Sequence, residues 1–253
     1  MRWPAEALWE AVVPLLPGFT VEILPEIDST NTELMRRARA GRLEPVLLVA
    51  ETQTAGRGRL GRDWHSTPGD SLTFSLALPL NPPDWSGLSL AVGVSVAESL
   101  HPAVGLKWPN DLWWQERKLA GILIETASFG KERHAVIGVG VNLAPREAAG
   151  LSTPPAGLRE LLPGIEATQV LLQLGEPLVR TVLAFERQGF APFAARFNER
   201  DVLRGREVML SDGQHGMAHG VDDRGALLVH TAAGMKHVTS SDISVRPRAA
   251  PQP

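Results

Sequence analysis

A segment of seven residues, Gly56–Arg62, constrains the fold and the chemistry of this chain more than any other part of the sequence. It holds three glycines and three arginines and follows the apolar run Pro45–Ala50 closely. Read alone, it contains the G-x-G-x-x-G pattern that joins a strand to a helix in dinucleotide-binding folds. However, Pro68-Gly69 lies just beyond it, and no helix is expected to continue through that pair. We therefore exclude a dinucleotide-binding turn, and the missing G-x-x-x-x-G-K-[ST] pattern excludes a P-loop.

The composition of this segment suits anion binding. Glycines let backbone N–H groups approach an anion closely, and arginines add charged hydrogen-bond donors around it. The segment therefore predicts a site for a phosphate or a carboxylate, on a loop that orders over its ligand like a lid. From the loop alone, a solvated basic loop and a nucleic-acid-binding patch stay open as alternatives.

Apolar patterning predicts helices and strands around this loop. The expected helices show the 3.6-residue period, and the expected strands show alternation or short continuous apolar runs. The helices are expected at Ala5–Leu16, Thr32–Ala40, Leu88–Leu100 and Gln169–Arg187, and the strands at Pro45–Ala50, Ser71–Leu78, Leu106–Trp114, Lys118–Thr126 and His134–Asn142. Residues 145–163 are rich in Pro, Gly and Ala, which predicts an irregular connector.

The sequence changes in character after Leu203, where short apolar runs alternate with glycine-containing turns. Short strands with regularly spaced turn signals are typical of a small β-barrel. We therefore expect two domains, a larger one over residues 1–200 and a small one over residues 201–253.

Lysine is rare in this chain, with only four lysines among 25 basic residues. Lys118 begins an almost wholly apolar strand, where burial of a free ammonium group would be costly. Either Lys118 reaches solvent at the strand end, which is the commoner arrangement, or it meets an anion inside a cleft. Both alternatives stay open at this point.

Two further polar residues stand at the ends of predicted strands or turns. Asp111, beside the turn formers Pro109 and Asn110, could supply an oxygen ligand to Mg²⁺, although one carboxylate does not establish a metal site. Asn142 ends its strand with an amide that could read the edge of an adenine, or it could simply form a turn.

Composition excludes several classes of protein. The chain has no cysteine, which rules out disulfides, thiolate metal sites and a cysteine nucleophile. Its formal net charge is -3, so no overall charge points to nucleic acid or to an anionic membrane. No apolar stretch reaches membrane-spanning length and the first residues do not form a signal peptide, so we expect a cytoplasmic protein without membrane contact.

Taken in order, five segments resemble the catalytic domain of biotin protein ligases. They are Asp28–Asn31, Glu51–Trp64, Lys107–Leu112, Lys118–Leu123 and Gly138–Asn142. The tail resembles the SH3-like C-terminal domain of that family. The resemblance implies an α+β fold, with a mixed sheet covered by helices on one side, similar to the core of class II aminoacyl-tRNA synthetases, plus the small barrel.

The resemblance also implies a reaction and its residues. Biotin and ATP would form biotinyl-5′-adenylate in the presence of Mg²⁺, and a lysine of a biotin carboxyl carrier protein would then accept the biotin. Transferred by motif, the catalytic residues are Lys118, Arg57 and Arg59, and Asp111 lies near the metal. Ligand-binding roles fall to Ser29, Thr30, Asn31, Gln53, Arg57, Gly58, Arg59, Trp64, Lys118, Gly121 and Asn142, of which Ser29, Thr30 and Gln53 face the ureido ring of biotin and Asn142 faces adenine.

Two other functions share parts of this pattern. A lipoate protein ligase shares the fold and the adenylate chemistry, but the Gly-Arg loop and the Lys-Trp-Pro-Asn-Asp segment favour biotin. A nucleic-acid-binding module would use the arginine loop and the barrel, and it predicts binding that weakens steeply with salt. The net charge argues against that second rival.

Two expectations concern assembly and DNA. Only 27 residues precede Asp28, fewer than the winged helix-turn-helix domain that bifunctional members of the family carry. We therefore expect a monofunctional ligase without sequence-specific DNA binding. A homodimer formed by sheet pairing is compatible with the sequence, whereas no residue stands out as the base for the acceptor amine.

Overall fold

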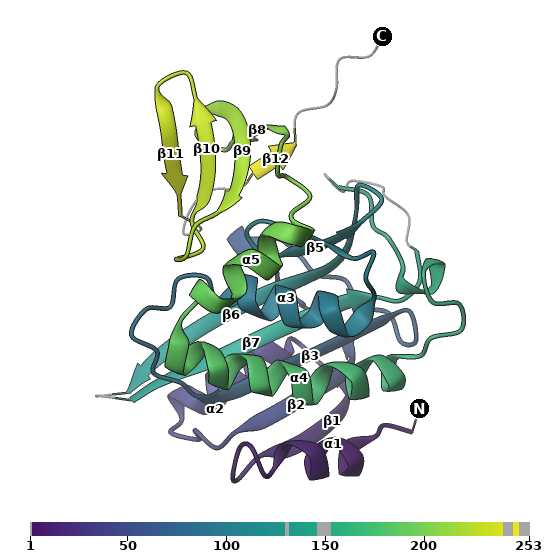
Figure 1. The fold of residues 1–253 in the computed structure, drawn as a ribbon. Helices are drawn as coiled ribbons and strands as arrows, with labels where there is room; N and C mark the ends of the chain where they lie inside the picture. The colour runs from purple at the N-terminus through teal and green to yellow at the C-terminus, as the bar shows by residue number, and fades with distance from the viewer. Residues whose placement is uncertain (1, 130–131, 146–152, 240–244, 248–253) are drawn as a thin grey trace.

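The structure of the chain, a computed structural model, describes residues 2–129, 132–145, 153–239 and 245–247. A seven-stranded sheet with helices packed against it forms the larger part, and a five-stranded sheet formed by the end of the chain lies beside it (Figure 1). This confirms the predicted α+β class. Among the described residues, no helix is both long and apolar enough to cross a lipid bilayer.

Helices and strands are interspersed along the chain as far as Arg200, and the elements that the structure describes after it are all strands. The helices are α1 (Ala5–Val12), α2 (Thr30–Arg39), α3 (Leu88–Leu100), α4 (Ala167–Gln188) and α5 (Ala191–Arg200), with short 3₁₀ turns at Arg59–Gly61 and Leu158–Glu160. The strands of the large sheet are β1 (Thr20–Ile27), β2 (Val46–Gln53), β3 (Ser71–Pro79), β4 (Gly105–Lys107), β5 (Asp111–Trp114), β6 (Arg117–Phe129) and β7 (Glu132–Asn142). Those of the small sheet are β8 (Glu207–Leu210), β9 (His215–Val221), β10 (Leu227–Thr231), β11 (Gly234–Val238) and β12 (Val245–Pro247).

The large sheet has the order β1-β2-β3-β7-β6-β5-β4. Only β1 and β2 run parallel, because helix α2 connects them as a crossover, and the remaining neighbours are antiparallel. The sheet is therefore mixed, as the sequence resemblance implied. Its central strands β3 and β7 are almost fully buried. The apolar run of β7 matches this burial, whereas β3 alternates apolar residues with Ser71, Thr73 and Ser75, a pattern that predicts a half-buried strand.

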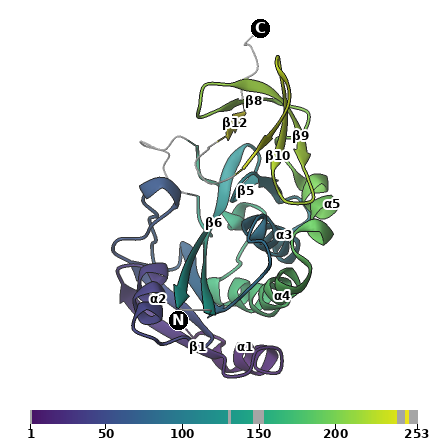
Figure 2. The ribbon, with the colours of Figure 1, turned by 90° about the vertical axis from the view of Figure 1, so that its left-hand side faces the viewer.

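Helices cover both faces of this sheet, so the expectation of helices on one side was wrong. Helices α1, α3 and α4 pack into the main apolar core on one face. Helix α2 lies against the opposite face, as Figure 2 shows. There Leu34 and Met35 form a second, smaller core with side chains of β2, β3 and β7. Because α2 is short, the rest of that face stays available for a site.

Some secondary-structure predictions need correction. The run Leu106–Trp114 was expected to be one strand, but it forms the hairpin β4–β5. Pro109 cannot donate a ladder hydrogen bond, and the chain turns at Trp108–Asn110 around a cis Trp108-Pro109 bond. Strand β1 and helix α5 were not expected. Helix α4, in contrast, continues without a break through Gly175 and Pro177.

The small sheet contacts the large domain through several defined hydrogen bonds. The indole Nε1 of the fully buried Trp108 donates to the carbonyl of Gly225 at 3.1 Å. Asn198 of α5 bonds both backbone groups of Val221, at 3.0 and 2.8 Å. The turn of the β4–β5 hairpin and helix α5 are thereby anchored to the C-terminal part of the chain.

A buried carboxyl group lies where α5 leads into that sheet. Asp201 accepts a hydrogen bond from the backbone N–H of Leu203 at 2.9 Å, while its Oδ2 is buried without a partner among the described residues. Burial raises the pKa of Asp201 from 3.8 to about 6. The folded protein therefore favours the protonated acid. Its stabilising contribution is complete below pH 3.8 and is lost as the pH rises through about 6.

We expect Asp201→Asn to stabilise the protein at pH 8 by roughly 1–2 kcal/mol, because the neutral amide replaces a buried charge. The gain should shrink towards pH 4, where both side chains are neutral. Urea unfolding of the two proteins at pH 4.5, 6 and 8 measures this difference. A difference in unfolding free energy that does not change with pH would contradict the assignment.

Candidate active site

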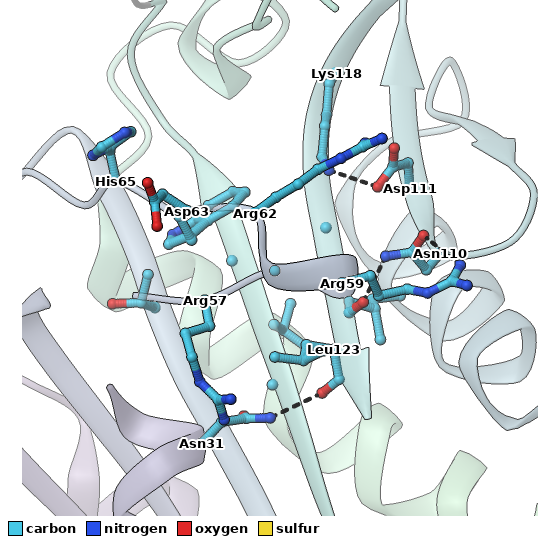
Figure 3. A pocket seen from close by; sticks show the side chains of 18 of the residues that line it. Asn31, Arg57, Arg59, Arg62, Asp63, His65, Asn110, Asp111, Lys118 and Leu123 are labelled. Atoms are coloured by element: carbon cyan, nitrogen blue, oxygen red, sulfur yellow. Dashed lines mark hydrogen bonds and ion pairs between the residues drawn. The ribbon is translucent and has the colours of Figure 1, made fainter. Parts of the chain in front are cut away.

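A cavity of about 780 Å³ opens on the face of the large sheet that α2 only partly covers. Its lining comes from the N-terminus of α2, the Gly56–Arg62 loop, the β4–β5 hairpin, strands β3, β6 and β7, the connector after β7, and Val245 of the small sheet. All twelve residues that the sequence predicted for the site line this cavity. The close view in Figure 3 shows the arginine loop crossing over the strands of the sheet.

The floor of the cavity is a row of residues that face one another across neighbouring strands. Lys107 pairs with Asp111, Asp111 with Gly121, Gly121 with Gly140, and Gly140 with Thr73. Because directly paired residues share one face of a sheet, all five side-chain positions point into the cavity. The floor is therefore polar at both ends and bare at the two central glycines.

Gly140 makes room for Trp64. A Cβ at Gly140 would overlap with the indole ring of Trp64, and a Cβ at Gly121 would lie 3.6 Å from its Cζ3. The indole thus lies directly against the backbone of β7, next to β6. Only glycine permits so close an approach at position 140. The structure thereby places the predicted residues Trp64 and Gly121 side by side in the cavity.

A β-bulge turns Lys118 towards the cavity. The register of β6 against β5 shifts here, so that Leu119 has no partner on β5. In an unbroken strand, Lys118 would share a face with Ala120, which is buried in the main core. The extra residue instead places Leu119 in that core and Lys118 in the cavity lining. Bulges beside active sites commonly redirect a side chain in this way.

Lys118 is held on both its side chain and its backbone. Its Nζ lies 2.6 Å from Oδ1 of Asp111, and the two side chains are 29% and 17% exposed. Its backbone N–H donates to Pro154 at 2.8 Å, and its carbonyl accepts from Ala156 at 2.8 Å and from Nδ2 of Asn142 at 3.1 Å. Of the two alternatives for this lysine, the structure shows the one in which the ammonium group lies in a cleft.

A hydrogen-bonded cluster forms the opposite end of the cavity, at the N-terminus of α2. Ser29 caps that helix, and the backbone N–H and hydroxyl of Thr30 both donate to Oε1 of Gln53, at 2.8 and 3.0 Å. Ser75 of β3, which is fully buried, lies 2.7 Å from Oγ1 of Thr30 and 2.6 Å from Oδ1 of Asn31. The sequence did not identify Ser75, because nothing in its strand distinguishes it from a structural serine.

Two arginines of the loop are hydrogen-bonded to different elements. Arg57 donates to both carboxylate oxygens of Glu125 on β6, at 2.9 Å, and Arg59 donates to Oδ1 of Asn110 at 3.3 Å. The loop closes on itself through a bond from the N–H of Gly58 to the carbonyl of Arg62, at 2.6 Å. Asn110 and Glu125 had no predicted role, although Asn110 lies in a segment that carried the family resemblance.

The cavity is positively charged even though the whole chain is slightly negative. Five cationic side chains line it, against two carboxylates. The cations are Arg57, Arg59, Arg62, Lys107 and Lys118, and the carboxylates are Asp63 and Asp111. Half of the four lysines of the chain therefore lie in this one cavity. Such a lining can bring two anions together, because it offsets their mutual repulsion.

Within the described ranges, no three histidine or carboxylate side chains are grouped so that they could hold a metal ion by themselves. Asp111 is the predicted metal ligand, and one of its oxygens contacts Lys118.

Comparison with known proteins identifies the family. Residues 23–142 match the model of the Biotin/lipoate A/B protein ligase family, and residues 205–246 match that of the Biotin protein ligase C terminal domain. The chain is 37% identical over 244 residues to the bifunctional ligase/repressor BirA of Escherichia coli, an alignment that covers 91% of this chain and 75% of that protein. The chain belongs to the biotin protein ligase family.

Other biotin protein ligases align over nearly their whole length. The biotin–[acetyl-CoA-carboxylase] ligase of Paracoccus denitrificans is 31% identical, over 87% of this chain and 98% of that protein. The solved structure of the biotin protein ligase from Aquifex aeolicus in complex with biotin and ATP superposes with a TM-score of 0.76 at 31% identity, covering 90% of this chain and 99% of that chain. Membership of the biotin protein ligase family confirms the resemblance found in the sequence and the small SH3-like C-terminal domain.

Proposed function

We propose that this chain forms biotinyl-5′-adenylate from biotin and ATP and then transfers the biotin to a lysine of a biotin carboxyl carrier protein. The observation that carries the proposal is the single cationic cavity in which all twelve predicted residues meet. The Aquifex aeolicus relative was solved with biotin and ATP together, which supports the same pair of substrates for this chain. The names of the relatives refer to biotin and to acetyl-CoA-carboxylase, and this favours biotin over lipoate and an enzyme over a nucleic-acid-binding module.

In the first half-reaction, a carboxylate oxygen of biotin attacks the α-phosphorus of ATP, and pyrophosphate leaves with the electrons of the broken P–O bond. Both reactants are anions, so the barrier falls when cations offset their repulsion and fix their approach. Lys118 is proposed to contact the carboxylate and the α-phosphate. Arg57 and Arg59 are proposed to close over them from the loop. Asp111 holds the ammonium group of Lys118 in place at 2.6 Å.

The two substrates are proposed to occupy opposite ends of the cavity. The cluster of Ser29, Thr30, Asn31 and Gln53 offers both donors and acceptors, which suits the ureido ring of biotin. Trp64, on its glycine floor, offers an aromatic face for adenine, and Asn142 lies at the same side of the cavity. The reacting carboxylate and phosphate would then meet near Lys118.

In the second half-reaction, the amine of the carrier lysine attacks the carbonyl carbon of biotinyl-5′-adenylate. A C–N bond forms, the C–O bond to the phosphate breaks with its electron pair going to AMP, and the amine nitrogen releases a proton as AMP leaves. The positive charge of Lys118 would stabilise the negative charge that grows on the carbonyl oxygen and on the departing phosphate. No covalent bond to the enzyme is needed, which agrees with a chain that has no cysteine.

Mg²⁺ is part of the proposal as the ion that enters with ATP. Such an ion is held mainly by phosphate oxygens and needs only one or two protein carboxylates. Asp111 supplies one carboxylate in the cavity, so the residues fit an ATP-bound ion. When bound, the ion would neutralise charge on the phosphates.

The assignment is tested by acid-dependent release of pyrophosphate. The purified protein with MgATP should release pyrophosphate when biotin is added and should not do so with lipoate. Addition of a biotin carboxyl carrier domain should then yield the biotinylated lysine, detected by mass spectrometry. Release driven by lipoate alone would assign the chain to lipoate chemistry. Tight, salt-dependent binding of nucleic acid without retention of biotin would overturn the enzyme assignment.

Arg59→Gly is expected to loosen the loop over the adenylate. Its guanidinium donates to Oδ1 of Asn110 in the turn of the β4–β5 hairpin, and glycine removes that contact and makes the backbone of the loop more flexible. We expect biotinyl-5′-adenylate to dissociate about five- to tenfold faster, as for the loss of one charged hydrogen bond. Escaped adenylate should then label bystander proteins such as serum albumin. An intermediate retained as long as in the wild type would contradict this role.

A further inference from the structure

A carboxylate outside the cavity lining connects three elements at the end of the cavity that is proposed to bind biotin. Glu125 lies on β6, and its side chain is 26% exposed. Both of its oxygens accept from Nη2 of Arg57 at 2.9 Å, and its Oε2 also accepts from Nδ2 of Asn31 at 3.1 Å. The Nε of Arg57 donates in turn to the hydroxyl of Thr32 at 3.1 Å. One carboxylate thus connects the sheet, the first turn of α2 and the arginine loop.

The position of Glu125 follows from the strand itself. Beyond the bulge, β6 alternates regularly, so Gly121, Leu123 and Glu125 point towards the same face. Gly138 on β7 lies opposite Leu123, and a Cβ there would overlap with the amide oxygen of Asn31. The glycine therefore allows Asn31 to lie flat on the sheet, with its amide nitrogen against Glu125. In Figure 3, Arg57 points towards Asn31 and away from Lys118.

We propose that Glu125 is a positioning residue that holds Arg57, and with it the start of the Gly56–Arg62 loop, over the biotin end of the cavity. This inference rests on the proposed function. Arginine loses substantial side-chain freedom when it is fixed, and Glu125 fixes it before any ligand arrives. The loop is thereby partly ordered before biotin or ATP binds.

The charge of Glu125 matters most after the first half-reaction. Free biotin brings a carboxylate that can attract Arg57, but in the adenylate this group has become a neutral acyl group. Arg57 then loses one anionic partner, whereas Glu125 keeps its charge throughout. We therefore expect Glu125 to act on retention of the intermediate more than on the rate at which it forms.

The test compares Glu125→Gln with a matched control, Glu176→Gln, which breaks the Arg180–Glu176 pair on the surface of α4. We expect Glu125→Gln to raise the dissociation rate of biotinyl-5′-adenylate about five- to tenfold, the scale of a partly exposed ion pair with several hydrogen bonds. The apparent KM for biotin should rise, while the maximal rate of adenylate formation should change less than about twofold. The control should match the wild type in all three quantities.

A double-mutant cycle separates positioning from a general structural role. If Glu125 acts through Arg57, Arg57→Ala and Arg57→Ala/Glu125→Gln should release the adenylate at the same rate. Dissociation rates that multiply in the double variant would show that Glu125 acts independently of Arg57 and would overturn the proposal. Wild-type dissociation in Glu125→Gln would overturn it as well.

A second measurement needs no ligand and does not depend on the function. Trypsin cleaves after arginine, and the loop offers Arg57, Arg59 and Arg62. We expect brief digestion, followed by mass spectrometry, to cut this loop several-fold faster in Glu125→Gln than in Glu176→Gln. Equal cleavage of the two variants would show that Glu125 does not hold Arg57 and the loop in place, even if biotin were not the substrate. A wild-type protein that forms no biotinyl-5′-adenylate would instead overturn the proposed function, and the role in retention with it.

Discussion

Replacement of Lys118 with alanine should slow the formation of biotinyl-5′-adenylate by a factor on the order of 100 or more, as the loss of other single electrostatic stabilisers does. The ammonium group lies in the cavity because a bulge turns it there, and its backbone is fixed by the connector and by Asn142. No other lysine can take its place from the same strand. Without Lys118, the carboxylate of Asp111 would also remain in the cavity and repel both substrates.

Rapid-quench measurement of single-turnover adenylate formation tests this expectation. Lys236→Ala is the matched control, because Lys236 pairs with Asp212 on the small sheet at 2.8 Å, outside the cavity lining. The control should keep the wild-type rate. A Lys118→Ala protein that forms the adenylate at the wild-type rate would show that the ammonium group plays no part in the chemistry.

Gly140→Ala is expected to have the second largest effect, through Trp64. The added methyl group would overlap with the indole ring, and the backbone of a central strand cannot retreat. Overpacking of this kind typically destabilises the folded arrangement by about 1–3 kcal/mol. Since the indole is the more mobile partner, it should be displaced. We therefore expect the KM for ATP to rise at least about tenfold, with little change in the binding of biotin alone.

Titration calorimetry with biotin, and steady-state kinetics with ATP, distinguish the two ends of the cavity. In a Trp64→Ala background the clash is gone, so Gly140→Ala should have no further effect on the KM for ATP. If Gly140→Ala raises the KM for ATP equally in both backgrounds, or weakens the binding of biotin more than that of ATP, the glycine does not act by making room for the indole.

The sequence predicted the identity of the site residues better than their arrangement. Gly56–Arg62 and Lys118 are recognisable because their residue types are unusual in their surroundings, and Arg57–Arg62 and Lys118 line the cavity. Alternation along β6, however, would have placed Leu119 towards the cavity and Lys118 in the core. The bulge that reverses them depends on pairing with β5 and leaves no mark in the local pattern.

Other features were missed for related physical reasons. Ser75 and Glu125 have ordinary residue types for their strands, and their roles arise from contacts with residues that are distant in sequence. Helix α5 begins next to Pro192, which reads as a break although proline is well tolerated in a first turn. The hairpin β4–β5 turns at Pro109 and Asn110, which are turn formers, so the sequence does carry a signal for this turn although the apolar residues on both sides suggested one strand.

The central claim is that Lys118 and the arginine loop surround the point where the carboxylate of biotin meets the α-phosphate of ATP. A crystal structure with a non-hydrolysable analogue of biotinyl-5′-adenylate measures this directly. We expect Nζ of Lys118 within about 3 Å of an oxygen of the acyl-phosphate group, with Arg57 and Arg59 closed over it. An analogue bound elsewhere, or bound in this cavity with Lys118 contacting only Asp111, would contradict the account.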